Sequence, residues 1–117
     1  MNIEQLREYC IDKKGVEETF PFDNDTLVFK VMGKMFALTS LSNPVSVNLK
    51  CDPEKAIEWR ASYGAVNPGF HMNKQHWNTV TFNEDISDKI ILGMVDDSYT
   101  LIVQSLTKKL QQELSSL

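Results

Sequence analysis

Between Ala65 and Val80 the chain concentrates side chains that donate hydrogen bonds or offer aromatic faces, around a Pro-Gly turn. They include both histidines of the chain, one Lys, one Trp, one Phe and three Asn: Asn67, Phe70, His71, Asn73, Lys74, His76, Trp77 and Asn78. Such side chains on irregular backbone are typical of a loop held in a defined shape, and loops of this kind often bind a ligand. The segment therefore indicates a binding site, although it does not specify a reaction.

The spacing within this segment does not favour a metal site. His71 and His76 are five residues apart, whereas common zinc-binding pairs on a helix are four apart. Hydrogen-bonded structural histidines are the simpler interpretation, and the asparagines can hold the loop by bonding to its own backbone. Lys74 is harder to explain structurally, because a cation between two histidines adds repulsion.

Catalytic motifs are missing from the chain. It has no Gly-x-Ser-x-Gly, no Gly-x-x-x-x-Gly-Lys, no Gly-x-Gly-x-x-Gly and no His-Glu-x-x-His. The sequence therefore predicts a protein that is not an enzyme, with no cofactor and no metal. An active site assembled from His71, Lys74 and His76 stays open as an alternative, but no substrate is indicated.

Charge is distributed unevenly along the chain. The net charge is −4, with a pI near 5.1, which argues against a protein that coats itself in nucleic acid. Residues 30–82 nevertheless carry six basic and three acidic residues, so their net charge is +3, between two acidic ends. An anionic partner would be steered towards this middle region, although an imbalance of this size also arises by chance.

Length and composition predict one soluble domain spanning residues 1–117. Hydrophobic residues make up 42% and charged residues 24% of the chain, as in ordinary globular proteins. No apolar run approaches the about 18 residues that span a bilayer, so we expect a cytoplasmic protein without a membrane partner. A monomer is expected, because the chain has no apolar heptad pattern and no long unpatterned apolar run. Cys10 and Cys51 fit no Cys-x-x-Cys pattern, and we expect two free thiols.

Apolar periodicity and turn residues predict the elements. A helix over 2–13 begins at Asn2 and ends at Gly15, and a β region opens at Phe20-Pro21-Phe22. Strands are expected over 27–32, 35–40 and 45–50, the first two joined by a turn at Gly33-Lys34. A helix capped by Asp52-Pro53, a long loop, a strand over 76–82 and a final helix after Ser87 complete the chain. Gly93 and Asp96-Asp97 are expected to break or kink that final helix.

The order α-β-β-β-β-α-β-α predicts an α+β fold, an antiparallel sheet with helices packed on one face. The other sheet face would then be open to solvent or to a partner. Alternation along the strands places Val28, Lys30 and Met32 on the open face, together with Ser46, Asn48 and Lys50. Asn78 joins them, with His76 and Val80, unless Trp77 turns that strand the other way.

Several motifs together resemble the MmcQ/YjbR family of small bacterial proteins. They are Phe20-Pro21-Phe22, Val28-Phe29-Lys30-Val31, Gly33-Lys34-Met35-Phe36-Ala37-Leu38, Asn48-Leu49-Lys50-Cys51-Asp52-Pro53, Pro68-Gly69-Phe70-His71-Met72-Asn73-Lys74, His76-Trp77-Asn78-Thr79-Val80, and Asp96 with Ser98-Tyr99. The resemblance covers nearly the whole chain. It implies a CyaY-like two-layer α/β sandwich with a "double wing" motif, and a DNA-binding role.

Three hypotheses follow. The first is a DNA-binding module without catalytic activity, whose contact residues would be Lys30, Lys34, Lys50, His71, Lys74, His76 and Asn78. The second is an adaptor or small-anion-binding protein that uses the loop from Asn67 to Asn78 as a pocket. The third is an unrecognised enzyme.

Overall fold

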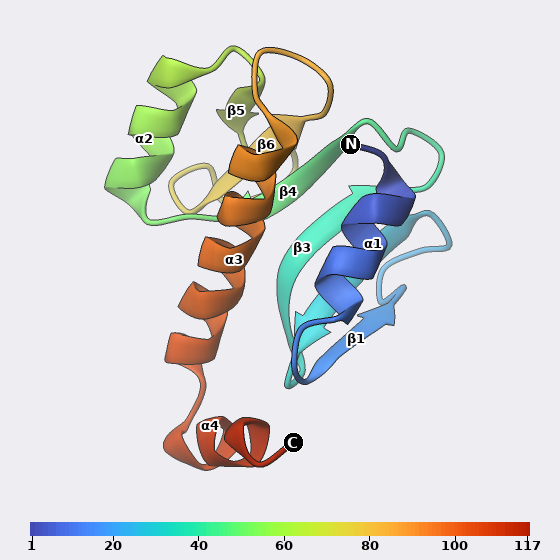
Figure 1. Cartoon of the computed structure of the whole chain (residues 1–117), viewed down its shortest axis with the longest axis vertical. Coiled ribbons are helices and arrows are strands. Elements are labelled where there is room, and N and C mark those ends of the chain that lie inside the picture. The colour runs from blue at the N-terminus through green and yellow to red at the C-terminus, as the bar shows by residue number, and fades with distance from the viewer.

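The computed structural model describes all 117 residues as four helices and six strands (Figure 1). In chain order these are α1 (Ile3–Ile11), β1 (Val16–Thr19), β2 (Thr26–Val31), β3 (Lys34–Ser40), β4 (Ser46–Lys50), α2 (Pro53–Ser62), β5 (Val66–Pro68), β6 (Trp77–Thr81), α3 (Asp88–Ser105) and α4 (Lys108–Ser115). The α+β class and the antiparallel sheet are confirmed. The structure adds two short elements, β5 and α4, to the predicted order.

The six strands form one sheet in the order β1-β2-β3-β4-β6-β5, and every neighbouring pair is antiparallel. Figure 1 shows α1 and α3 in front of the sheet, α2 beside β5, and α4 beyond the lower end of α3. All four helices contribute side chains to one core, so the predicted two-layer arrangement is confirmed. None of the helices combines the length and apolar character that a membrane crossing requires.

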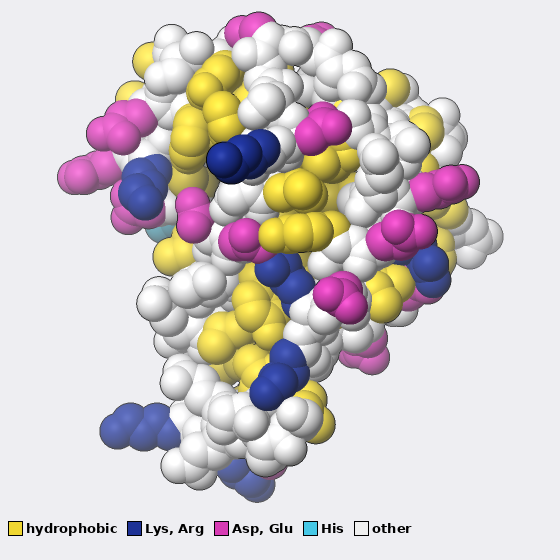
Figure 2. All heavy atoms as spheres, viewed as in Figure 1, with side chains coloured by type: hydrophobic (Ala, Val, Ile, Leu, Met, Phe, Trp, Pro, Cys, Tyr) yellow, Lys and Arg dark blue, Asp and Glu magenta, His cyan; other side chains and the backbone are white.

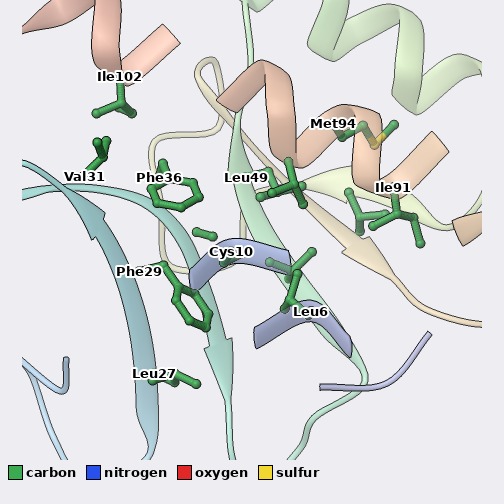
Figure 3. Close-up of a cluster of buried hydrophobic side chains, with 14 of the residues drawn as sticks. Leu6, Cys10, Leu27, Phe29, Val31, Phe36, Leu49, Ile91, Met94 and Ile102 are labelled. Atoms are coloured by element: carbon green, nitrogen blue, oxygen red, sulfur yellow. The ribbon is translucent and has the colours of Figure 1, made fainter. Parts of the chain in front are cut away.

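The core lies between the sheet and the helices (Figure 3). Leu27, Phe29 and Val31 alternate along β2 and point into it, as strand geometry requires. Cys10 of α1 is fully buried among them and, like Cys51, is a free thiol as expected. Burial raises the pKa of Cys10 to about 12, so this thiol stays protonated near neutral pH.

The first helix begins and ends where the sequence predicts, to within two residues. Asn2 and Gln5 form a reciprocal capping box, with hydrogen bonds of 2.9 and 3.0 Å, and this satisfies two free backbone N–H groups. Gly15 then takes a left-handed conformation with φ of +74°, which allows the chain to turn into β1.

The hairpin between β2 and β3 turns one residue earlier than predicted. Its central residues are Met32 and Gly33, which have φ values of 50° and 86°, while Lys34 is already the first residue of β3. Positive φ at both positions is the pattern of a type I′ turn, whose twist matches that of the flanking strands. The apolar Met32 gives no sequence signal for such a turn.

The prediction of a first β region at Phe20-Pro21-Phe22 was wrong by a few residues. The strand is β1, in which Val16 pairs with Val31 and Thr19 pairs with Val28. Pairing ends before Pro21, because proline has no N–H group to donate to a ladder. The three residues after β1 instead lie in an exposed loop that leads to β2.

The position of the break in the final helix was also predicted wrongly. Helix α3 runs through Gly93 and Asp96-Asp97 without interruption, and the chain bends only at Leu106-Thr107. Thr107 caps the new helix α4 by accepting a hydrogen bond from the N–H of Leu110 at 3.2 Å. The second part of the predicted final helix is therefore a separate helix, α4, whose N-terminal cap is Thr107.

Asp96, within α3, binds two side chains of the α1 region. The Lys13 ammonium lies 2.5 Å from one carboxylate oxygen of Asp96, and the Tyr9 hydroxyl donates to both oxygens at 2.8 and 2.9 Å. The Lys13 ammonium also lies over the rings of Tyr9 and Tyr99. The hydrogen bond to Asp96 raises the pKa of Tyr9 to about 12. This cluster ties α1 to α3.

Strands β3 and β4 pair over a short stretch and then separate where α3 crosses them (Figure 1). Their register contains two pairs, Ala37 with Leu49 and Leu38 with Asn48. Beyond these, the fully buried Ser98 of α3 bridges the strands: its hydroxyl donates to the carbonyl of Phe36 at 2.6 Å and accepts from the N–H of Lys50 at 2.9 Å. A helix side chain thus replaces one missing contact of the ladder.

Candidate functional site

The sheet face opposite the helices carries a small apolar cluster and an adjoining polar surface. Val28, Leu38 and Trp77 form the cluster, with Met35 and Met72 packed beside them. Trp77 therefore points away from the main core, and this fixes the phase of β6. We call this side of the sheet the open face.

A groove of about 850 Å³ crosses the polar part of the open face. Strands β3, β4, β6 and the start of β2 form its floor, and loops at both sides form its walls. The lining residues are Phe22, Asp25, Thr26, Leu38, Thr39, Ser40, Asn43, Val45, Ser46, Asn48, Asn67, Pro68, Phe70, His71, Met72, Thr79 and Thr81. Most of them are hydroxyl, amide or apolar side chains, and Lys and Arg are not among them.

The loop between β5 and β6 forms one wall and is the segment that the sequence singles out. It begins at Gly69, whose N–H donates to the carbonyl of Trp77 at 2.8 Å. A Cβ on Gly69 would lie 2.8 Å from the Cβ of Trp77, so a larger residue does not fit there. The Lys74 ammonium closes the loop by donating to the carbonyl of Gly69 at 3.0 Å. Lys74 is thus engaged within the protein.

Arg60 of α2 anchors the end of the same loop. Its guanidinium donates to the side-chain oxygen of Asn78 at 2.7 Å and to the backbone carbonyl of Lys74. The Asn78 amide in turn donates to the carbonyl of Ala56. Asn78 is only 3% exposed and lies on the helix side, so its expected place on the open face is corrected. No local sequence signal marks Arg60 as part of this site, because its long side chain joins α2 to residues of the loop and of β6 that are distant in the sequence.

Phe70 and His71 are held at the rim of the groove by their backbone. The Thr79 hydroxyl accepts from the N–H of Phe70 at 2.9 Å and donates to Asn48 at 2.5 Å, while the Asn48 amide donates to the carbonyl of Phe70 at 3.3 Å. His71 has a φ of 58°, which is uncommon for a residue other than glycine. The two rings lie against each other, with centroids 4.1 Å apart.

The other wall is the loop that leads into β2. Asp23 accepts hydrogen bonds from the N–H groups of Thr26 and Asp25, and Asp25 accepts from the Ser40 hydroxyl and from the N–H of Ser42. These hydrogen bonds hold the pKa of both carboxyl groups below their usual range. They also fix the loop that presents Phe22, whose side chain is 63% exposed.

The predicted contact residues do not form one continuous patch. Lys30 and Lys50 share the open face by register, opposite Glu17 and Trp77 respectively. Lys34 instead reaches the carbonyl of Ser105 at the end of α3, at 3.3 Å. Figure 2 shows the helix side, where basic and acidic side chains are interspersed around apolar areas.

The two histidines have different positions. His71 lines the groove, whereas His76 is a half-buried residue whose backbone carbonyl accepts from the N–H of Cys51 at 2.8 Å. Nowhere in the structure do three His, Cys, Asp or Glu side chains come together as metal ligands. Of the two histidines, only His71 lies at the groove, together with Phe70 and Asn48.

These features define a class: a small α+β sandwich with helices on one sheet face and, on the other, a groove lined by hydroxyl and amide side chains. The model of the YjbR family matches residues 11–101, so the chain belongs to this family, as its motifs predict.

Curated relatives and a solved structure agree with this membership. The chain is 34% identical to the uncharacterized protein YjbR of Escherichia coli K12 over 110 residues, which cover 93% of each chain. It is 36% identical to the uncharacterized protein YbdF of E. coli O157:H7, over 93% of this chain and 90% of that one. The crystal structure of Deinococcus radiodurans protein DR2400, a DUF419 protein, has a TM-score of 0.90 and 37% identity. That alignment covers 97% of this chain and 87% of the other.

Proposed function

We propose that this protein is a nucleic-acid-binding module without catalytic activity and that the open face is its interface. The observation that carries the proposal is the groove: its floor offers hydroxyl and amide groups, and an exposed Phe stands on each wall. Groups of this kind hydrogen-bond to base edges and stack on bases. The family resemblance to double-wing proteins points in the same direction.

Lys30 and Lys50 are the best candidates for phosphate contacts. Both share the open face by register, on strands β2 and β4, and neither is part of a salt bridge. Lys34 and Lys74 are weaker candidates, because each donates to a backbone carbonyl of the protein itself. Two phosphate contacts on a chain of net charge −4 imply modest affinity at low salt.

The groove offers little for catalysis. His71 and Asp25 are its titratable lining groups, and Asp25 already accepts hydrogen bonds from Ser40 and Ser42. No Ser, Cys or Lys lies there beside a free base as an activated nucleophile would require. We therefore propose binding without reaction.

A pocket for a small ligand or a protein segment is the second candidate. The groove volume of about 850 Å³ lies within the range of small-molecule sites, and the first part of the loop from Asn67 to Asn78 forms one of its walls. The Asp25 carboxylate in the lining disfavours a small anion. A neutral small molecule or an extended peptide would fit the groove better than a small anion.

We also propose that the protein acts as a cytoplasmic monomer. Bacterial nucleic acid lies in the cytoplasm, and the sheet edges are poorly suited to pairing with another copy. Edge strand β5 has three residues and ends at Pro68, while edge strand β1 carries Glu17 and Glu18. Short, charged or proline-containing edges discourage association of sheets.

The test is fluorescence anisotropy of labelled DNA, both duplex and single-stranded, titrated with the protein at about 50 and 200 mM salt. Two phosphate contacts predict about a ten-fold loss of affinity between these salt concentrations. Lys30→Glu and Lys50→Glu should each weaken binding and reduce the salt dependence.

Lys109→Glu is the matched control, because it makes the same charge change at an exposed position of α4. Equal effects of all three substitutions would place the interface elsewhere. If neither DNA form binds at low salt while a peptide or small molecule competes for the groove, the second candidate replaces the first.

A further inference from the structure

We propose that the groove receives single-stranded nucleic acid, with unpaired bases stacked on Phe70 and His71 at one wall and on Phe22 at the other. This inference rests on the proposed function, because it names the form of nucleic acid that the same face accepts. It goes beyond that function by assigning the aromatic contacts and by excluding the duplex as the preferred ligand.

Phe70 is an exposed aromatic residue on a rigid support. Its side chain is 67% exposed, although apolar burial would normally be favourable. Its N–H and carbonyl groups are both bound, by Thr79 and Asn48, so the backbone does not need to become ordered when a ligand arrives. The neighbouring ring of His71, whose plane is tilted by 54° from that of Phe70, offers a second aromatic surface beside it. A fixed, exposed aromatic surface is what a stacking site for bases requires.

Phe22 supplies a second aromatic surface at the opposite side of the groove. It precedes β2, whereas Phe70 follows β5, and the strand order β2-β3-β4-β6-β5 places β3, β4 and β6 between them. Ser46, Asn48 and Thr81 line the floor in this interval. The hydroxyl groups of Ser46 and Thr81 can donate to and accept from the edges of unpaired bases, and the Asn48 amide keeps one N–H beyond the one that binds the Phe70 carbonyl.

The shape and charge of the groove disfavour a duplex. Proteins that read duplex DNA insert a protruding helix or ribbon into its major groove and neutralise many phosphates. Here the surface is hollow, its lining contains no Lys or Arg, and two lysines share the surrounding face. The Asp25 carboxylate would repel a phosphate in the groove but not a base. A single strand, whose bases are free to turn inward, satisfies these conditions.

The experiment measures the affinity of labelled 15-nucleotide oligo-dT and oligo-U, and of a mixed-sequence single strand with its duplex, for the intact protein. We expect the single strand to bind more tightly than the duplex. Phe70→Ala and Phe22→Ala should each weaken single-strand binding about 5- to 150-fold, the range measured when one base-stacking residue is removed. Comparing oligo-dT with oligo-U shows whether DNA or RNA is the source of the strand.

Two controls separate stacking from apolar contact and from unfolding. Ile57→Ala removes an exposed apolar side chain from α2, where the exposed fraction is 63%, and should leave binding unchanged. Phe70→Trp should retain binding whereas Phe70→Leu should lose it. Because Phe70 and Phe22 are exposed, their variants should melt at the temperature of the unsubstituted protein.

The outcomes distinguish the two proposals. Tighter binding of the duplex would overturn this inference and leave the nucleic-acid-binding function standing. Single-strand binding that is unaffected by Phe70→Ala and Phe22→Ala, or that Phe70→Leu retains, would also overturn it. Binding of neither form would overturn the proposed function itself.

Discussion

Ser98 shows how one small side chain shapes the sheet. Its hydroxyl occupies the place where β3 and β4 separate, and it is bonded to a backbone group of each strand. Without this hydroxyl, the Phe36 carbonyl and the Lys50 N–H would lie in the protein interior without a hydrogen-bond partner. Such unpaired groups cost free energy, because they lose their hydrogen bonds to water without replacement.

We therefore expect Ser98→Ala to lower the free energy of unfolding by about 1–3 kcal/mol, as for other buried groups left without a partner. Urea unfolding followed by circular dichroism measures this change. Ser62→Ala is the matched control, because Ser62 is exposed near the end of α2 and its loss should change stability by less than about 0.5 kcal/mol. Equal effects of the two substitutions would contradict the structural role of Ser98.

At the scale of elements, α4 depends on a glycine far away in the chain. Gly15 has a positive φ, and a Cβ placed on it would lie 2.4 Å from the Cδ1 atom of Leu114, a buried side chain of α4. The turn after α1 therefore leaves space only for hydrogen at this position. Gly93 in α3 is the opposite case, since it is exposed and nothing lies within 4 Å of a Cβ added there.

Replacing these two glycines by alanine should change the stability of the protein in opposite directions. Gly15→Ala should destabilise the protein by about 1 kcal/mol or more, because it strains the backbone and pushes against Leu114. Gly93→Ala should stabilise it by about 0.5–1 kcal/mol, because alanine reduces the freedom of the unfolded chain. Thermal unfolding of both variants measures the difference, and hydrogen exchange of α4 should rise in Gly15→Ala alone. Destabilisation by Gly93→Ala would contradict this account.

Caps, turns and apolar periodicity in the sequence predict most helices and strands, but they do not predict the side-chain contacts between these elements. Caps at Asn2, Asp52 and Ser87 mark helix starts because capping uses neighbouring residues. Of the residues that the sequence singles out between Ala65 and Val80, Asn67, Phe70 and His71 line the groove, whereas Asn73, Lys74, His76, Trp77 and Asn78 do not. The sequence does not decide which face of β6 is buried, because Trp77 and Asn78 exchange their usual environments. The Trp lies on the open face, and the Asn is buried with Arg60.

At the scale of the molecule, carboxylates hold several loops in place. Asp23 and Asp25 bind backbone N–H groups before β2 and after β3, and Asp85 accepts from the N–H groups of Gly64 and Ala65 at 2.6 and 2.8 Å. Together with the hydrogen bond from the Ser40 hydroxyl to Asp25, these bonds lower the pKa of all three carboxyl groups. A carboxyl group with a lowered folded-state pKa binds fewer protons when folded than when unfolded, so its stabilising effect disappears on acidification.

The melting temperature should consequently be nearly constant from pH 7 to pH 5 as far as these groups are concerned, and fall below about pH 4. Asp85→Asn should lower the melting temperature at pH 7, and the difference from the unsubstituted protein should shrink as the pH falls. Glu84→Gln is the control, because this exposed neighbour makes none of these hydrogen bonds. Calorimetry across the pH range measures both variants, and a pH-independent effect of Asp85→Asn would refute the prediction.

The separation of β3 from β4 also divides the sheet into two halves, and each half is built from one continuous segment of the chain. Residues 16–40 contain β1, β2 and β3, which pair with one another as a meander, and residues 46–81 contain β4, β5 and β6. Strands β2 and β3 pair through residues close in sequence, which costs little entropy, whereas β4 pairs with β6 across α2 and the loop before β6, from Ser46 with Thr81 to Lys50 with Trp77. The halves share two register pairs, a hydrogen bond from the Thr39 hydroxyl to the Ser46 carbonyl at 2.8 Å and the bridge through Ser98. Helix α3, which follows both halves along the chain, therefore helps to join them. We therefore expect the two halves of the sheet to stay docked only when α3 is in place.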